Sequence, residues 1–302
     1  AKHLVKMINH AEDNVLLVDE DLLPRIEKIK DQLPTVKAFI VMSNKKELPP
    51  TTLAPSYTYE ALLEKGDPAF QLVKNLDENS PAGLCYTFSS LGELRGVIYT
   101  HRAIVLHSLV IGLGETLALT EEDVCMPVVP MFHVNAWGLP YASTWFGAKQ
   151  VLPGPHFTPE DLADLIANEG VTVSASVPTV WLGLLMVLMK GEHDTSSLRA
   201  MISGGSAVPM SLINAYDELG IPLYQAYGMT ETTPLVSVSR LKSYHKNLSE
   251  TEKNLLRAKQ GLLVPGLEMK VMGAKGEVKW NGLEVGELLL RGPWVSAGYY
   301  KD

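Results

Sequence analysis

The sequence has little cysteine and no cluster of basic residues. Two of its 302 residues are cysteines, Cys85 and Cys125, and their spacing suits neither a metal site nor a disulfide framework. Isolated thiols are typical of a reducing compartment, so we expect a cytoplasmic location. The formal net charge is -8, from 34 acidic and 26 basic residues. Without a stripe of lysine and arginine, this acidic balance argues against nucleic-acid binding.

A long uninterrupted apolar run is also missing. The most apolar stretch, residues 103–119, is interrupted by His107, Ser108, Gly112, Gly114 and Glu115, and it is too short to span a bilayer. The first residues, AKHLVKM, do not contain the apolar core of a signal peptide. The sequence therefore predicts no transmembrane segment and leaves peripheral membrane contact open.

The composition is that of a globular protein. Hydrophobic residues make up 46% of the chain and charged residues 20%, and the length is enough to bury a sizeable core. The acidic total does not exclude small anionic ligands, because backbone amides and helix N-termini bind phosphate locally.

Apolar strands alternate with amphipathic helices along most of the chain. The clearest helix follows Thr158, a capping residue, with Pro159 in its first turn and Gly170 at its end. The same reading predicts strands at 15–18, 38–42, 171–177, 200–203 and 222–226, helices at 20–33 and 210–219, and a helix that begins at the Ser249 capping box. This alternation predicts an α/β fold of packed β-sheets flanked by helices.

The pattern changes after Gly261. Short alternating strands are expected at 268–272, 277–280 and 286–291, separated by glycines. We therefore expect an α/β part over residues 1–260 and the start of a small β-barrel-like subdomain over residues 261–302.

Three segments contain residues suited to chemistry. They are YTFSSLGELRGV at 86–97, YQAYGMTE at 224–231 and GELLLRGPWVSAGYY at 286–300. In the second segment, Tyr227 offers a flat face to an aromatic base and Glu231 a carboxylate suited to Mg²⁺. Such a short pattern by itself also fits an ordinary strand-to-turn junction with a solvated Thr-Glu pair.

Taken in this order, the segments resemble the adenylate-forming superfamily over nearly all of the chain. YGMTE and GELLLRGP are the most specific motifs, and PMFHVNAWGLPY at 130–141 and VPTVW at 177–181 resemble the medium- and long-chain fatty acyl-CoA synthetases. The resemblance implies an AMP-forming fatty acid–CoA ligase that uses ATP, Mg²⁺ and CoA. A fatty acid would attack ATP to give an acyl-adenylate, and the CoA thiolate would then displace AMP.

The resemblance also assigns residues. Thr230 would contact the α-phosphate, Glu231 would hold Mg²⁺, and His133 would lie beside the acyl carboxylate as the third catalytic residue. Trp181 would border the acyl channel together with Val177. The nucleotide-binding positions would be Thr87, Ser90, Gly92, Arg95, Gly204, Gly205, Ser206, Ala207, Gln225, Ala226, Tyr227, Gly228 and Thr230, with Tyr227 stacked on adenine. Burial preferences alone favour a core role for His133 and Trp181.

The first segment departs from the family's phosphate loop. Phe88 and Leu91 stand where relatives carry hydroxyl side chains, Leu94 replaces a proline and Arg95 a lysine. The loss of two hydrogen bonds to a phosphate costs roughly 3–6 kcal/mol, which is about 10²- to 10⁴-fold in binding or rate.

Two alternatives therefore stay open beside the ligase. One is a relative that binds acyl chains, nucleotides or a partner without catalysis, and the other transfers the acyl group to a carrier protein. The chain also stops at Asp302, before the family's ribose-binding Asp and C-terminal domain, so alone it is not expected to complete the reaction. A homodimer stays open.

Overall fold

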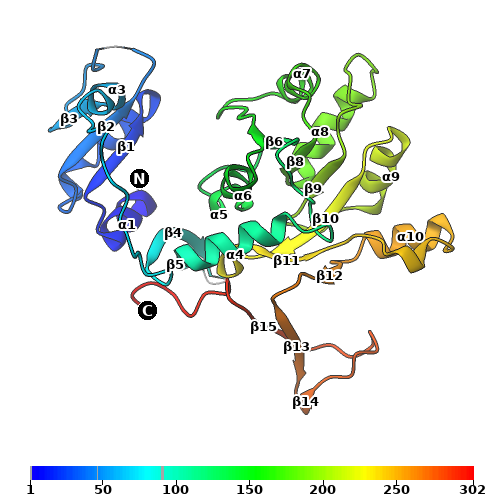
Figure 1. Ribbon diagram of the computed structural model, residues 1–302. Helices are drawn as coiled ribbons and strands as arrows, with labels where there is room; N and C mark the ends of the chain where they lie inside the picture. Colours follow the sequence, from blue (N-terminus) through cyan, green and yellow to red (C-terminus); the bar gives the residue numbers. More distant parts are fainter. Residues whose placement is uncertain (1, 46, 90–91) are drawn as a thin grey trace. The chain divides into compact units, whose positions relative to one another are not determined.

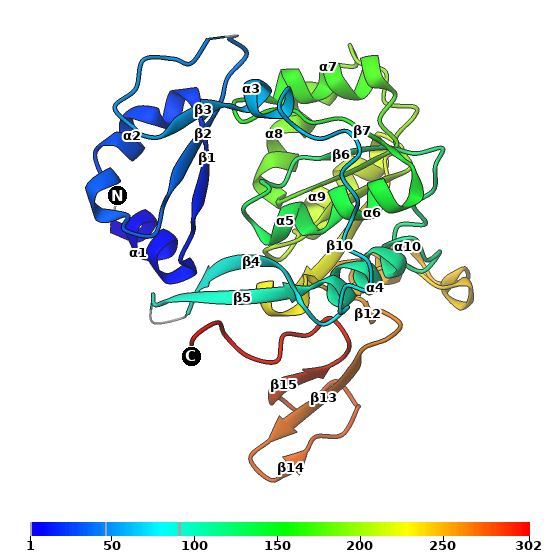
Figure 2. The ribbon, with the colours of Figure 1, turned by 60° about the vertical axis from the view of Figure 1, so that its left-hand side comes forward.

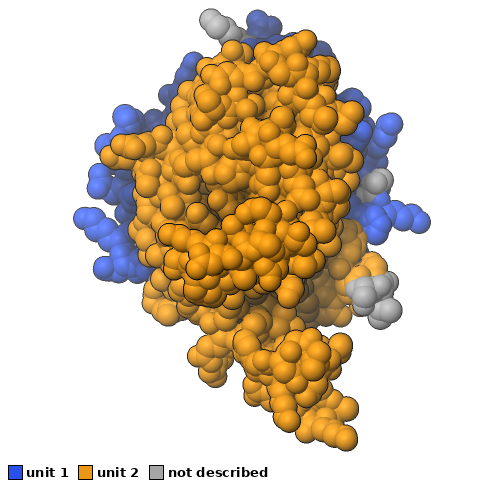
Figure 3. Space-filling view, turned by 90° about the vertical axis from the view of Figure 1, so that its right-hand side faces the viewer, with its two compact units in different colours: residues 1–76 blue, residues 77–302 orange. Residues whose placement is uncertain are grey.

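The computed structural model describes residues 2–45, 47–89 and 92–302, and it divides the chain into two compact units, Ala1–Leu76 and Asp77–Asp302, coloured separately in Figure 3. The first unit contains a parallel sheet of β1 (Val15–Asp19), β2 (Ala38–Met42) and β3 (Ser56–Thr58), with α1 (Lys2–Ala11) and α3 (Tyr59–Leu63). Val18 and Val41 lie in its apolar core with Ile26 and Leu33.

The helix expected over residues 20–33 is divided into three pieces. They are η1 (Glu20–Leu22), α2 (Leu23–Glu27) and η2 (Lys30–Gln32). Pro24 causes the first division, because proline has no N–H and fits only the first turn of a helix.

The second unit is built on a seven-stranded sheet. Its order is β12 (Leu262–Leu263), β11 (Leu235–Val238), β10 (Leu223–Gly228), β9 (Ala200–Ser203), β8 (Val173–Ser176), β6 (Val124–Pro127) and β7 (Lys149–Gln150). The five strands from β10 to β7 are parallel, whereas β11 and β12 are antiparallel. This arrangement confirms the α/β fold predicted from the alternation of strands and helices.

Helices cover both faces of this sheet (Figure 1). The helices α7 (Pro159–Glu169), α8 (Pro178–Leu188) and α9 (Met210–Glu218) pack on one face, and α4 (His101–Ile111) and α6 (Leu139–Phe146) pack on the other. The helix α7 is capped by Thr158 and ends at Gly170, as predicted. Its first turn also has a capping box between Thr158 and Asp161, and Gly170 has φ 65°. The helix α10 (Glu250–Arg257) likewise begins at a capping box between Ser249 and Glu252.

Two smaller sheets complete the second unit. The strands β4 (Pro81–Phe88) and β5 (Leu94–Thr100) form a hairpin. A separate sheet has the order β14 (Gly276–Glu277), β13 (Glu268–Gly273) and β15 (Glu287–Arg291). Because β14 and β15 are its two edges, this sheet is open, and the barrel-like closure expected near the C-terminus is not confirmed for the described strands.

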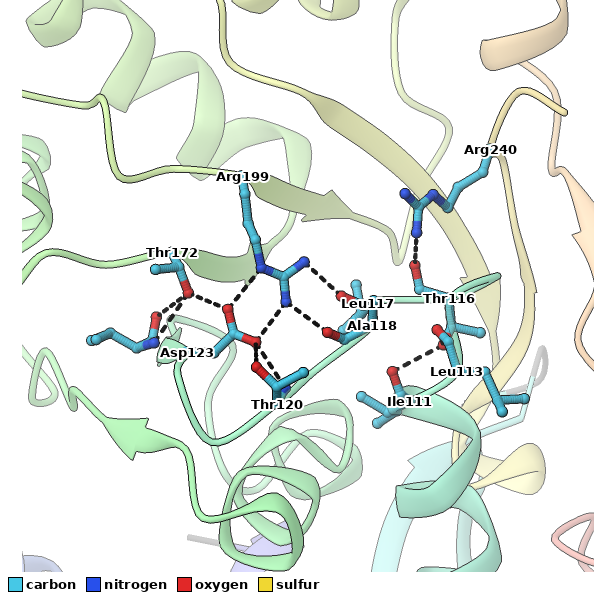
Figure 4. Close-up of polar contacts among 11 residues, drawn as sticks. Ile111, Leu113, Thr116, Leu117, Ala118, Thr120, Asp123, Thr172, Arg199 and Arg240 are labelled. Atoms are coloured by element: carbon cyan, nitrogen blue, oxygen red, sulfur yellow. Dashed lines mark hydrogen bonds and ion pairs between the residues drawn. The ribbon is translucent and has the colours of Figure 1, made fainter. Parts of the chain in front are cut away.

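A buried ion pair holds the loop between α4 and β6 (Figure 4). Asp123 is 4% exposed and receives two hydrogen bonds of 2.7 Å from Arg199. The same guanidinium donates to the carbonyls of Leu117 (2.8 Å) and Ala118 (3.0 Å), and the hydroxyl of Thr172 donates to Asp123 at 2.6 Å. Burial alone raises the pKa of Asp123, but the hydrogen bonds from Arg199, Thr172 and the Thr120 amide outweigh it and lower this pKa to about 2.

We predict that Asp123→Asn lowers the free energy of unfolding by about 2 kcal/mol at pH 7. The folded pKa of Asp123 lies below its ordinary value of 3.8, so this stabilisation is present above pH 3.8 and is lost as the pH falls toward 2. Denaturant titrations across that range should show the difference between the two proteins shrinking. Glu169→Gln, in the exposed pair with Lys149, is the control and should cost about 0.5 kcal/mol or less. An equal loss in both variants would contradict the prediction.

Candidate functional site

A cavity of about 340 Å³ lies in the second unit, at the carboxyl ends of β9 and β10. Ligands of open α/β sheets bind at this edge. Its wall combines the end of β4, the segments that follow β9 and β10, and the segment before α6. The residues there are Thr87, Phe88, His133, Val134, Trp137, Gly204, Gly205, Ala226, Tyr227, Gly228, Met229, Thr230, Glu231 and Pro234.

The turn after β10 presents Thr230 and Glu231 to the cavity. It contains η3 (Thr230–Thr232), and the amide of Met229 donates to the Pro234 carbonyl at 3.1 Å. A Cβ atom at Gly228 would lie 2.1 Å from the Pro234 oxygen, so no other residue fits there without movement of the backbone. The Tyr99 hydroxyl donates to the Thr230 carbonyl at 2.8 Å, which fixes the turn from the β4–β5 side.

The glycines after β9 allow two elements to approach closely. A Cβ atom at Gly204 would lie 2.8 Å from the Ala226 carbonyl oxygen and 3.3 Å from the Trp137 ring. Trp137 and β10 can therefore both lie against this backbone. Tyr227, the next residue of β10, is half-buried and lines the same wall.

The segment that carries His133 and Trp137 has an uncommon backbone. In α5 (Val134–Trp137) all four residues have left-handed φ angles, between 50° and 56°, and Gly138 follows with φ 72°. Such a conformation costs roughly 1–2 kcal/mol for each non-glycine residue. Burial of Val134 and Ala136 offsets part of this cost, and so does a hydrogen bond of 3.3 Å from the Cys85 thiol to Asn135. Strain of this kind concentrates at functional sites.

The floor of the cavity is apolar. Ile111, Leu117, Leu139, Ala175 and Ile202 line it, and all five belong to the core between the sheet and the helices α4 and α6. Ala175 and Ile202 are neighbours across β8 and β9, and the short alanine side chain leaves room above the sheet.

Two arginines hold the loop that supplies Leu117 (Figure 4). Arg199 donates to the carbonyl of Leu117 itself, and Arg240 donates to the carbonyls of Gly114 (2.7 Å) and Thr116 (2.8 Å). The floor therefore belongs to a fixed part of the fold.

His107 connects α4 to this wall. It is 1% exposed, and burial lowers its pKa to about 3, so the imidazole is neutral at physiological pH. Its Nε2 accepts a hydrogen bond of 3.3 Å from the Leu235 amide at the start of β11. A Cβ atom at Gly138 would lie 2.8 Å from this ring, so the glycine makes room for it.

A family model described as AMP-binding enzyme matches residues 1–300. The chain belongs to this family. The long-chain-fatty-acid–CoA ligase of Thermus thermophilus is 47% identical over 300 residues, which are 99% of this chain and 54% of that protein. The medium-chain-fatty-acid–CoA ligase of Ectopseudomonas oleovorans is 40% identical over 301 residues, 99% of this chain and 55% of that protein. The chain thus spans about half the length of these curated relatives.

A solved structure shows the same fold. The crystal structure of a long-chain-fatty-acid-CoA ligase from Archaeoglobus fulgidus matches with a TM-score of 0.83 at 23% identity, covering 99% of this chain and 57% of that one. In the part of the present chain that the structure describes, no helix is long and apolar enough to cross a membrane.

The cavity brings together many of the residues assigned from the sequence. They are Thr87, His133, Gly204, Gly205, Ala226, Tyr227, Gly228, Thr230 and Glu231. His133 is exposed, so it is not the buried core histidine that its residue type favours. Sequence reasoning missed Trp137, His107 and the apolar floor. The sequence did place them in the apolar stretch at 103–119, in the motif at 130–141 and in the predicted strands at 171–177 and 200–203, but none of these patterns separates a cavity wall from a core.

Other assigned residues do not line the cavity, namely Gly92, Arg95, Val177, Trp181, Ser206, Ala207 and Gln225. Trp181 is fully buried, and its indole N–H donates to the Ile202 carbonyl at 2.8 Å. It therefore lies behind the strand whose Ile202 side chain forms the floor. Gln225 is also buried, and its amide oxygen accepts from the Val208 amide at 2.9 Å. Ser90 lies outside the described residues.

The segment that resembles the family's phosphate loop includes the end of β4 and the start of β5. The Ser89 amide donates to the Glu93 carbonyl and the Gly92 amide to the Ser89 carbonyl, both at 2.8 Å, while the Ser89 hydroxyl accepts from the Glu93 amide at 3.1 Å. These groups are used within the turn. Leu94, which stands in place of a proline, begins β5 opposite Phe88.

The residues at the polar end fit a magnesium ion that arrives with a nucleotide. Mg²⁺ is commonly held by one or two carboxylates together with substrate phosphates. Glu231 supplies one carboxylate at the cavity wall. The described residues contain no group of three His, Cys, Asp or Glu side chains that could hold a metal unaided. Substrate phosphates would thus have to complete the coordination.

We predict that His107 makes stability depend on pH. Its folded pKa, about 3, lies below the ordinary value of 6.5, so the unfolded chain binds the extra proton between these values. Stability therefore falls as the pH is lowered from 6.5, by at most about 1.4 kcal/mol per pH unit. His107→Gln, whose amide oxygen can accept from Leu235, should lose less stability than the unchanged protein between pH 6.5 and 4. The control is His101→Gln at the half-exposed start of α4, and parallel curves for all three proteins would refute the prediction.

Proposed function

We propose that this chain is the nucleotide- and acyl-binding part of a fatty acid–CoA ligase that forms an acyl-adenylate. One observation carries the proposal: a single cavity joins Tyr227, Thr230 and Glu231 at its wall to a floor of apolar core residues. A fatty acid with an apolar chain and a nucleotide with charged phosphates need an apolar environment and a polar environment side by side. The names of the two curated relatives, a long-chain and a medium-chain ligase, support the same class of substrate.

The residues divide the reaction between them. Tyr227 offers its ring to adenine and Thr230 its hydroxyl to the α-phosphate, while the apolar floor holds the tail and excludes water. His133 lines the same cavity, and we assign it the role of donating to the acyl carboxylate. When bound, Mg²⁺ neutralises phosphate charge, and Glu231 is the residue that would hold it.

The chemistry is an exchange at phosphorus followed by one at carbon. A carboxylate oxygen forms a bond to the α-phosphorus of ATP while the bond to pyrophosphate breaks, which gives the acyl-adenylate. The CoA thiolate then forms a bond to the acyl carbon, and AMP leaves with the bonding electrons. The alternative acceptor is the thiol of a carrier protein in place of CoA. A comparison of the two thiols as acceptors distinguishes a CoA ligase from an enzyme that loads a carrier protein.

A second candidate is a binding protein that does not adenylate. It is favoured by the β4–β5 turn, where Phe88 replaces a hydroxyl residue and the Ser89 and Gly92 amides are used within the hairpin. Such a protein would still bind AMP and fatty acids in the cavity.

Glu231→Gln tests the ligase directly. We expect fatty-acid-dependent exchange of pyrophosphate into ATP to fall at least about 100-fold in the complete gene product, because several kcal/mol of charge stabilisation depend on the metal. The measurement uses labelled pyrophosphate, and Glu169→Gln on the surface is the control. Exchange in the unchanged protein that is no greater than in Glu231→Gln would exclude adenylation and favour the binding protein.

Leu117 is expected to set acyl-chain preference. Leu117→Phe fills the floor and should shift the kcat/KM maximum to shorter acids, whereas Leu117→Ala should shift it to longer ones, each by several-fold for two carbons. Leu184→Ala is the matched control, because that leucine is buried on the opposite face of the sheet. An unchanged chain-length profile in both Leu117 variants would mean that the tail does not reach this floor.

A further inference from the structure

We infer that Tyr299 is a positioning residue that orients the Glu231 carboxylate for a magnesium-bound nucleotide. The inference rests on the proposed function. It concerns a residue of the segment at 286–300 that received no role from the sequence and does not line the cavity. Its basis is the contact between the chain's last segment, residues 292–302, and the turn after β10.

Tyr299 forms a hydrogen bond with one of the two carboxylate oxygens of Glu231. Its phenol donates to Oε1 at 2.8 Å. Among the described residues, no hydrogen bond or ion pair engages Oε2 of the same carboxylate. The hydrogen bond therefore fixes the orientation of the carboxylate, and Oε2 keeps all of its acceptor capacity for a ligand.

Tyr299 is itself held in place on its other side. The Arg95 guanidinium lies over its ring, 4.9 Å from the centroid, and pairs with Asp302 at 2.7 Å. Arg95 stands at the lysine position of the family's phosphate loop, yet here it supports the tyrosine. Arg95 belongs to the β4–β5 hairpin, whereas Tyr299 and Asp302 belong to the last segment of the chain.

Backbone hydrogen bonds fix the whole segment. The Ser296 amide donates to the Glu231 carbonyl and the Tyr300 amide to the Gly96 carbonyl, both at 2.7 Å. The Thr233 hydroxyl donates to the Trp294 carbonyl at 2.8 Å. Figure 2 shows the segment running beside β5 toward the C-terminus. It thus ties the hairpin to the turn that carries Glu231, with Tyr299 between them.

This arrangement has a specific consequence for metal binding. Partners that hydrogen-bond a metal-binding carboxylate orient it, and their removal commonly weakens metal affinity about 10- to 100-fold. Removal of the phenol should therefore weaken binding of a nucleotide that brings a metal. The affinity for a nucleotide without a metal should stay unchanged, because adenine and the α-phosphate would contact other residues.

The test is Tyr299→Phe, which removes the hydroxyl and keeps the ring under Arg95. Calorimetry of the complete gene product should show affinity for MgATP reduced about 10-fold, while metal-free AMP binds within about twofold of the unchanged protein. Tyr244→Phe is the matched control, because it removes an exposed phenol from η4 (Ser243–His245), and it should bind both ligands normally.

The outcomes separate cleanly. Unchanged or tighter MgATP binding by Tyr299→Phe would overturn the inference, and so would an equal loss for MgATP and AMP, which would make Tyr299 a structural residue only. A loss confined to MgATP supports positioning. If the unchanged protein bound neither nucleotide, the proposed function would fail and the inference with it.

Discussion

The close backbone approach between Gly228 and Pro234 is the constraint on which the site depends. It turns the chain back at the end of β10, so that β11 returns antiparallel beside it and the intervening residues are pushed over the sheet edge. Tyr99 and Ser296 then bind the Thr230 and Glu231 carbonyls from two sides. The backbone of the turn is fixed while both side chains still reach the cavity, which is how preorganised sites avoid ordering costs when a ligand binds.

The polar end and the apolar floor of the cavity are both built on the seven-stranded sheet. The strands β8 and β9 direct small and apolar side chains toward α4 and α6, and this face is both a core and a floor. Charge is costly at such a floor, so a ligand's charged groups must stay near the turn and its apolar part must enter. The neutral His107 and the left-handed turn at Val134–Trp137 occupy the boundary between the two regions. Both carry a physical cost that packing around them offsets.

The sequence predicts local helices and strands well, but it predicts poorly which residues contact one another in the folded chain. Capping residues and apolar spacing were enough for α7, from Thr158 to Gly170, because a helix boundary is set by a few adjacent residues. The hydrogen bond between His107 and Leu235, and the place of Trp181 behind Ile202, depend on how the sheet folds back on itself. Apolar spacing says that a residue is buried, without saying against what. The letters VNAW do not predict four left-handed residues in a row, since only asparagine among them favours that conformation.

The hydrogen bonds of the β4–β5 hairpin explain how the segment at 86–97 differs from a phosphate-binding loop. In a loop that wraps phosphate, amides and hydroxyls must be free to donate to the ligand, whereas here the Ser89 and Gly92 amides bond within the turn. Leu94 in place of proline allows the strand to begin early, and Arg95 then points toward Tyr299 and Asp302. Arg95, which stands in place of a lysine, is thus the side chain that connects the hairpin to the C-terminal segment. In the proposed function, the hairpin would support Glu231 through Tyr299, and the turn after β10 would hold more of the phosphate.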